Sequence, residues 1–109
     1  MKSNDIATVY VTFTGSQGGK RRPVVIVDDN AKEVSFFSIT SQYGTKSKRI
    51  KKVYFPICDW QQAGLKKESW IDVGSLKAIP KNKGNVTYRK IGRLSIADMR
   101  NLNAFLEDL

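Results

Sequence analysis

Short runs of β-forming residues, separated by turn signals, fill most of this chain, and they favour a mainly β fold. In residues 7–13 apolar side chains alternate with threonine and tyrosine, as in a strand with one buried face. Residues 23–27 form a continuous apolar run that starts at Pro23 and ends at the turn signal Asp28-Asp29-Asn30, which predicts a central strand. Further strands are predicted at residues 34–40, 53–57, 69–73 and 76–79, with Pro56 at an edge or a bulge. Residues 41–48 and 80–85 are predicted to be loops.

The C-terminus follows a different pattern, because its apolar residues recur at the spacing of an α-helix. Ser95 is a favourable N-cap, and Asp98 follows in a capping-box position. We interpret the apolar stripe as a surface for core packing; it comprises Ile96, Met99, Leu102, Phe105, Leu106 and Leu109. The resulting order, β-β-β-β-β-β-α, predicts a single domain over residues 1–109, a small, strongly bent sheet or barrel closed by one C-terminal helix.

The composition excludes several classes of protein. No apolar run approaches the length of a membrane span, so we expect no membrane partner. The chain has one cysteine, Cys58, which rules out an internal disulfide, suits a cytoplasmic location, and in its apolar setting is predicted to be a buried structural thiol. It has no histidine, the usual metal ligand and the commonest general base. We therefore expect neither a metal nor a cofactor.

The net charge of +9 is unevenly distributed along the chain. No acidic residue lies between Glu33 and Asp59 or between Asp72 and Asp98, and each interval carries at least five lysines and arginines. The cluster Lys20-Arg21-Arg22 adds a third basic block. This distribution favours a polyanionic partner, either nucleic acid or an acidic protein. The alternative is a charged surface that only keeps a small domain in solution.

A glycine-rich loop that leads into a basic strand is the strongest candidate for a phosphate site. The glycines of residues 15–19 allow backbone to approach a ligand closely, and Pro23 fixes the direction of the chain into the strand. Arg22 offers a planar, always-charged fork of donors beside it. RNA is a substrate that such residues can cleave without histidine, because its own 2′-hydroxyl is the nucleophile. An arginine would stabilise the charge on the phosphorane.

Polar residues at the ends of other predicted strands are candidates for the same site. Thr40 and Ser41 could bind the same phosphate, or form only a strand-end hydrogen bond. Asp72 should face away from its apolar neighbours, where it could act as a base, read a base edge or pair with a lysine. Trp70 shares that face and could stack on an unpaired base, although a core role is the alternative.

At these residues the chain resembles the MazF/PemK (Kid) toxins of bacterial type II toxin–antitoxin systems. The likeness covers most of the chain, and the order and spacing of the motifs carry it more than any one of them. The motifs are Gly15-Ser16-Gln17-Gly18-Gly19 leading to Arg22-Pro23-Val24-Val25-Ile26-Val27, Ile39-Thr40-Ser41, Trp70-Ile71-Asp72 with Leu76-Lys77-Ala78-Ile79, and Ile91-Gly92-Arg93-Leu94-Ser95.

The resemblance implies an SH3-like small barrel of the CcdB/PemK type that forms a symmetric homodimer. It also implies metal-independent, sequence-selective cleavage of single-stranded RNA (mRNA), and neutralisation by a cognate antitoxin that occupies the RNA groove. By the pattern of the family, Arg22 is the catalytic arginine, Thr40 its phosphate-binding partner, and Asp72 lies where Kid-like members carry a catalytic aspartate. We expect RNA contacts from Gln17, Gly18, Gly19, Lys20, Arg21, Ser41, Gln42, Trp70 and Lys81.

The chain also departs from that pattern at positions that bear on catalysis. Ser16 runs directly into Gln17 where many relatives have an acidic residue, the first loop lacks a histidine, and Trp70 stands where Kid-like members have an arginine. The general base is therefore unassigned. These departures leave a second hypothesis open, a non-catalytic member of the same fold that binds nucleic acid or protein. A gyrase poison is disfavoured, because residues 105–109 contain no tryptophan.

Overall fold

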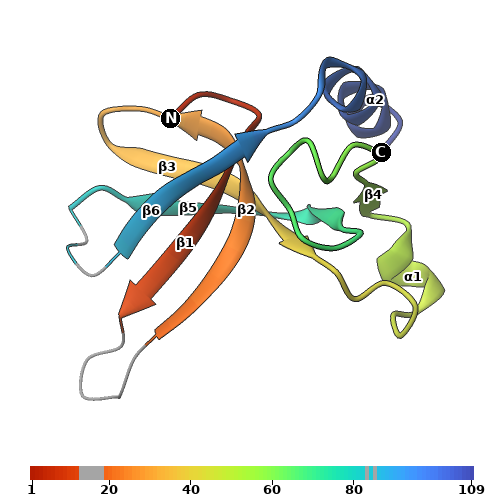
Figure 1. Cartoon of the computed structure of the whole chain (residues 1–109), viewed down its shortest axis with the longest axis horizontal. Coiled ribbons are helices and arrows are strands. Elements are labelled where there is room, and N and C mark those ends of the chain that lie inside the picture. The colour runs from red at the N-terminus through yellow and green to blue at the C-terminus, as the bar shows by residue number, and fades with distance from the viewer. Residues whose placement is uncertain (13–18, 83, 85) are drawn as a thin grey trace.

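The computed structural model describes residues 1–12, 19–82, 84 and 86–109, which form six strands and two helices (Figure 1). The strands are β1 (Asp5–Thr12), β2 (Gly19–Asp29), β3 (Glu33–Thr40), β4 (Tyr54–Pro56), β5 (Trp70–Pro80) and β6 (Val86–Arg93). The helices are the single turn α1 (Lys48–Lys51) and the C-terminal α2 (Ile96–Glu107). In the described part of the chain, neither helix is long and apolar enough to cross a membrane.

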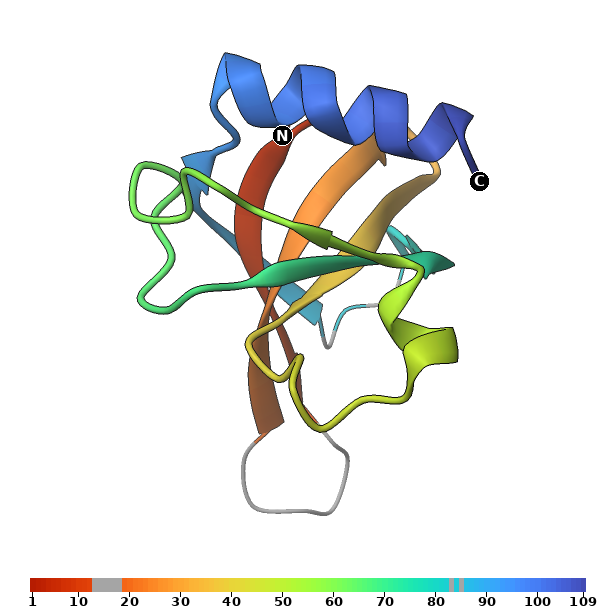
Figure 2. The same ribbon diagram turned by 90° about the vertical axis from the view of Figure 1, so that its right-hand side faces the viewer.

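All six strands belong to one antiparallel sheet with the order β4-β5-β3-β2-β1-β6. The sheet is strongly bent, and α2 lies across one end of it (Figure 2). The predicted mainly β fold with a C-terminal helix is therefore confirmed. Pro56 ends the edge strand β4, as expected of a residue that cannot donate to a ladder.

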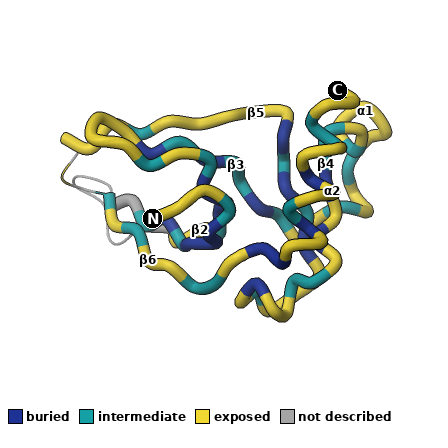
Figure 3. The backbone as a smooth tube through the Cα atoms, turned by 90° about the horizontal axis from the view of Figure 1, so that it is seen from above, coloured by how far each residue is buried: buried dark blue, intermediate teal, exposed yellow. Residues whose placement is uncertain are grey.

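The second half of the sheet differs from the prediction in three places. Residues 69–73 and 76–79, predicted as two strands, belong to the single strand β5, which is irregular between Asp72 and Leu76. Strand β6 was not predicted, because it is an edge strand with few buried side chains (Figure 3). The predicted loop 41–48 continues into α1, a turn that Ser47 caps by accepting a hydrogen bond from the backbone N–H of Ile50.

Two clusters of buried apolar residues lie on the two faces of the sheet. One lies under α2 and combines residues of β1, β2, β3 and β5 with Leu102 of the helix. The other contains Val24, Ile26, Val34 and Phe36 with residues of β1. The continuous apolar run of β2 is thus explained, because a central strand is buried on both faces.

Helix α2 begins at the predicted N-cap, since the hydroxyl oxygen of Ser95 accepts a hydrogen bond from the backbone N–H of Asp98. Its stripe packs on the core through Met99, Leu102, Phe105 and Leu106, as predicted. The prediction was wrong for Ile96 and Leu109, whose side chains are exposed because they lie at the two ends of the helix, beyond the core.

Two predictions about single residues near this helix were also wrong. Cys58 is exposed, because it begins a surface turn rather than continuing the buried strand before it. Asp98 does not complete a capping box. Its carboxylate instead accepts hydrogen bonds from the backbone N–H groups of Cys58 and Asp59, which lie in the loop after β4.

That loop brings the β4 end of the chain against β6 at the opposite edge of the sheet. Gly64 has φ +89°, and an added Cβ there would lie 2.3 Å from the carbonyl oxygen of Ile91. An added Cβ on Gly92 would lie 2.1 Å from the carbonyl oxygen of Ala63. Backbone therefore packs directly on backbone, and only glycine fits at either position. In Figures 1 and 2 the green loop accordingly lies beside the connection from β6 to α2.

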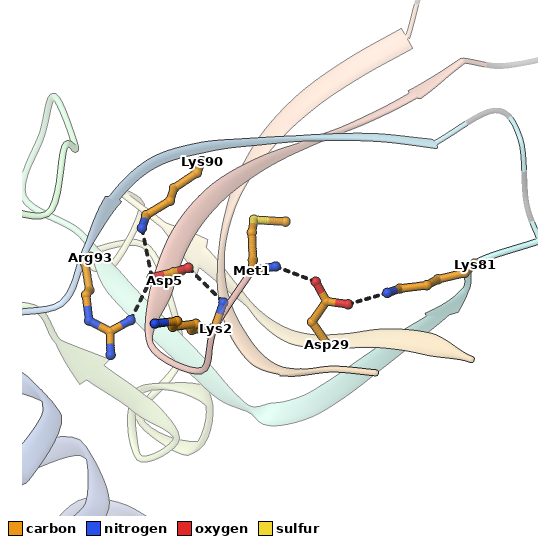
Figure 4. Close-up of polar contacts among 7 residues, drawn as sticks. All are labelled: Met1, Lys2, Asp5, Asp29, Lys81, Lys90 and Arg93. Atoms are coloured by element: carbon orange, nitrogen blue, oxygen red, sulfur yellow. Dashed lines mark hydrogen bonds and ion pairs between the residues drawn. The ribbon is translucent and has the colours of Figure 1, made fainter. Parts of the chain in front are cut away.

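Ion pairs tie the N-terminal segment to the sheet (Figure 4). The buried carboxylate of Asp5 accepts hydrogen bonds from the backbone N–H of Lys2 and from Arg93, and lies 3.4 Å from the Nζ of Lys90. Burial acts to raise the pKa of Asp5, but these hydrogen bonds and the charge of Lys90 outweigh it and hold the pKa below its ordinary value. Hydrogen bonds from Lys81 and from the N-terminal amino group likewise lower the pKa of Asp29.

Candidate functional site

A groove of about 820 Å³ opens where β2 and β3 separate. The β2–β3 ladder ends at the pair Val24–Ser38, whereas β3 continues to pair with β5 as far as Thr40 and Trp70. Pro23, the next residue of β2, has no N–H with which to extend a ladder. Residues of these strands and of the segment just after β3 line the groove: Arg21, Arg22, Pro23, Ser38, Ile39, Thr40, Ser41 and Gln42.

Strand register places the three predicted catalytic residues on one face of the sheet. Arg22 lies two residues beyond Val24 and Thr40 two residues beyond Ser38, so both share the face of that last ladder pair. Asp72 is directly opposite Ser38 on β5 and therefore points to the same face. All three side chains line the groove, although they come from three different strands.

The polar atoms of this row are held by local hydrogen bonds. The Oγ1 of Thr40 accepts a hydrogen bond from the backbone N–H of Gln42 at 3.1 Å, which leaves its own O–H available to donate. The Oδ1 of Asp72 accepts from the backbone N–H of Gly74 at 3.0 Å. No ion pair joins Asp72 or Arg22 to any residue within the described ranges. One ligand in the groove can therefore contact the guanidinium of Arg22, the hydroxyl of Thr40 and the carboxylate of Asp72.

Positive charge dominates the groove. Its described lining contains seven cationic side chains and one carboxylate, that of Asp72. The cations are Arg21, Arg22, Lys46, Lys66, Lys67, Lys77 and Arg89. Such a groove attracts a polyanion such as a nucleic acid strand.

Aromatic side chains flank the groove beside Asp72. Tyr54 lies directly opposite Asp72 on β4, and burial together with the negative charge of Asp72 raises its pKa above the ordinary value. The ring of Tyr43 packs against that of Trp70 with 4.8 Å between centroids, and the Nζ of Lys51 lies 4.8 Å from the centroid of Tyr43. Trp70 therefore packs beside the groove without lining it.

Apart from Trp70, the predicted RNA-contact residues fall into four groups. Arg21, Ser41 and Gln42 line the groove, and the guanidinium of Arg21 lies 5.6 Å from the centroid of the Tyr10 ring. Lys81 is engaged elsewhere, in an ion pair with Asp29 at 2.6 Å (Figure 4). Gly19 and Lys20 belong to β2 rather than to a loop, whereas Gln17 and Gly18 lie outside the described residues.

Sequence reasoning missed one wall of the groove, which the loop after β4 forms through Gly64, Leu65, Lys66 and Lys67. The adjacent lysines were a signal for a basic surface, but they lie next to Glu68 and outside the uninterrupted basic blocks. Tyr54 was missed as well, because its alternation with the core residue Phe55 marks it only as a residue on the outer face of a strand.

Comparison with protein families identifies a match over the whole chain. Residues 2–109 match the family described as PemK-like, MazF-like toxin of type II toxin–antitoxin system. The chain belongs to this family. No curated protein gives a match. Membership in the PemK-like, MazF-like family makes the chain a toxin of a type II toxin–antitoxin system and implies an antitoxin partner.

Proposed function

We propose that this toxin is a metal-independent, sequence-selective endoribonuclease that cleaves single-stranded RNA, mRNA included. One observation carries the proposal: a groove whose described lining has seven cations and a single carboxylate gathers Arg22, Thr40 and Asp72 on one face of the sheet. The cations favour a phosphodiester chain, and the three polar groups match the needs of transfer at one phosphate.

In the proposed reaction the RNA 2′-oxygen attacks the adjacent phosphorus and the bond to the 5′-oxygen breaks, which leaves a 2′,3′-cyclic phosphate. Arg22 stabilises the added charge on the phosphorane through its paired N–H donors, and Thr40 donates its hydroxyl to the same phosphate. Asp72 is the one carboxylate in the described lining and is our candidate to accept the 2′-hydroxyl proton. The departing 5′-oxygen takes up a proton from water, and Asp72 returns the 2′-hydroxyl proton to the solvent, so charge and atoms balance.

The decisive experiment incubates the purified protein with a long single-stranded RNA in EDTA and maps the cut ends. We expect discrete cuts that bear 2′,3′-cyclic phosphates. Arg22→Ala should lower kcat by at least about a hundredfold, the usual effect of removing a donor that stabilises a transition-state charge. Arg100→Ala is a matched control, because it removes an exposed arginine of α2 that does not line the groove.

The same experiment separates the enzyme from a non-catalytic member of the fold. RNA that is bound but stays intact, or a well-folded Arg22→Ala protein that cleaves like wild type, would refute the nuclease assignment. Arg22→Lys keeps the charge and loses the planar fork, so an activity well below wild type would tie catalysis to bidentate binding.

We further propose that the toxin acts as a homodimer and that its antitoxin covers the groove. Family membership supports the dimer, and the excess of positive charge in the groove, which an acidic segment of an antitoxin would complement, supports the second claim. Light scattering coupled to gel filtration tests the dimer. Competition between RNA and an acidic antitoxin peptide for the groove tests the second claim, and simultaneous binding of both would contradict it.

A further inference from the structure

The wall of the groove that residues 64–67 form has no regular secondary structure of its own. Residues 58–69 run from the end of β4 to the start of β5 as turns, and Gly64 to Lys67 within them face the groove. Two of the seven cations of the groove, Lys66 and Lys67, depend on the position of this segment. Backbone N–H groups of Ala63, Gly64 and Leu65 donate hydrogen bonds within the segment, and a restraint from outside it fixes these turns relative to the rest of the fold.

Asp98 of helix α2 supplies that restraint. Its side chain is completely buried, and its two carboxylate oxygens accept hydrogen bonds from the backbone N–H groups of Cys58 at 3.1 Å and Asp59 at 2.9 Å. The hydroxyl of Ser95 adds a second link, because it donates to the Oδ2 of Asp59 at 2.6 Å. The start of the loop is thus fastened to the first turn of α2 by charge-assisted hydrogen bonds.

Close packing of backbone against backbone fixes the far end of the same turn. Gly64 and Gly92 bring the backbone of residues 63–64 into direct contact with that of residues 91–92. Ala63 is completely buried between these contacts and the core. The segment is consequently held at two points, and the residues that follow the second point, from Leu65 to Lys67, enter the groove.

We propose that Asp98 is a positioning residue for the RNA groove: its carboxylate fixes the 58–67 wall and so sets the affinity for the RNA strand without touching it. The proposal rests on the proposed binding of RNA in the groove. Without the hydrogen bonds from Cys58 and Asp59 to Asp98, the 58–67 segment would move, and only the fraction of molecules with this segment in place would bind RNA tightly. The catalytic row on β2, β3 and β5 lies elsewhere in the groove and should keep its geometry.

Asp98→Asn tests this idea with a nearly isosteric change. An amide has one acceptor oxygen, so it can serve only one of the two N–H groups and presents its own NH₂ to the other. We expect the Kd for a single-stranded RNA blocked by 2′-O-methyl groups to rise about tenfold, and kcat on cleavable RNA to stay within about twofold. Hydrogen exchange of the 58–67 amides should speed up in the same protein.

Two controls separate positioning from loss of charge or stability. Asp108→Asn makes the same charge change at the exposed C-cap of α2 and should leave the Kd unchanged. Leu102→Ala empties part of the core below α2 and should lower stability at least as much, yet leave the Kd unchanged where the protein is fully folded. Equal losses of affinity in Asp98→Asn and Leu102→Ala would overturn the proposal.

The outcomes also distinguish this inference from the proposed function. Wild-type protein that binds RNA without cutting it refutes the nuclease, whereas the comparison of Kd values still decides the role of Asp98. Wild-type protein that binds no RNA overturns both. If Asp98→Asn fails to fold, Ser95→Ala removes the second link and should raise the Kd about threefold; an unchanged Kd overturns the proposal.

Discussion

Replacing Gly92 by alanine tests the closure of the sheet directly. The added Cβ would lie 2.1 Å from the carbonyl oxygen of Ala63 and 2.5 Å from its carbon, where ordinary van der Waals contact begins at 3.4 Å. The neighbour is backbone and is held in turn by the buried side chain of Ala63. Relief therefore requires β6 or the loop after β4 to move by more than about 1 Å.

The cost follows from that geometry. Overpacking a well-packed interior costs about 1–3 kcal/mol, and a clash between two backbones belongs near the upper end of that range. Alanine restricts the unfolded chain more than glycine does, which offsets about 0.4–1 kcal/mol. We expect Gly92→Ala to lower the free energy of unfolding by about 2 kcal/mol, which for a domain of this size lowers Tm by about 8–16 °C.

Urea unfolding followed by circular dichroism measures this effect. Gly44→Ala is the matched control, because an added Cβ at Gly44 meets no atom within 4 Å, and its stability should stay within about 0.5 kcal/mol of wild type. A Gly92→Ala protein as stable as the Gly44→Ala control would refute the reasoning. It would mean that the loop and β6 are not in backbone contact.

Three further predictions concern acid, catalysis and salt. Acid should destabilise the fold, because the pKa values of Asp5 and Asp29 are lower in the folded protein than the ordinary value of 3.8. The stability that these two carboxylates contribute is complete above pH 3.8 and is lost as the pH falls through their folded pKa values. Urea midpoints between pH 6 and pH 3 measure this loss, and Asp5→Asn should make the midpoint depend less on pH. Thr40→Val keeps the shape and removes the hydroxyl, so kcat for RNA cleavage should fall about tenfold; an unchanged kcat would remove Thr40 from the mechanism. Replacing Lys66 and Lys67 together by glutamine should reduce the slope of log K against log salt by up to about 1.4, and an unchanged slope would place the RNA elsewhere.

The sheet shows where sequence patterns suffice and where they fail. Strands β1 to β4 were predictable because their buried residues repeat with period two or form an apolar run. In β5 the ladder steps from Ser38–Asp72 to Phe37–Leu76, so the residues around Gly74 leave the pairing and divide one strand into two apparent ones. Strand β6 lacks a buried row to detect, since it lies at the edge of the sheet and none of its side chains is fully buried.

The sequence predicted the polar side chains that line the groove on β2, β3 and β5, but it did not predict the wall that the loop after β4 forms. Arg22 was noticed as an arginine at the entry to a strand, and Thr40 and Asp72 as polar residues of two other strands; the resemblance to the MazF/PemK toxins implied their catalytic roles. The loop wall was not found, because Lys66 and Lys67 reach the groove only through contacts distant in sequence. Those contacts run from Asp98 and Gly92, which no local pattern links to the loop.

Pro23 lies at the boundary between the paired part of β2 and β3 and the groove. From the sequence it indicated only the direction in which the chain enters β2. In the structure it stands where the β2–β3 ladder stops, one residue before Val24, while β3 goes on pairing with β5 to Thr40. The sheet therefore divides at this proline, and the polar groups of the groove lie on the strand ends beyond the division. In this chain a proline in a central strand, directly after a basic pair, thus marks the place where the sheet opens into the groove that we propose for RNA.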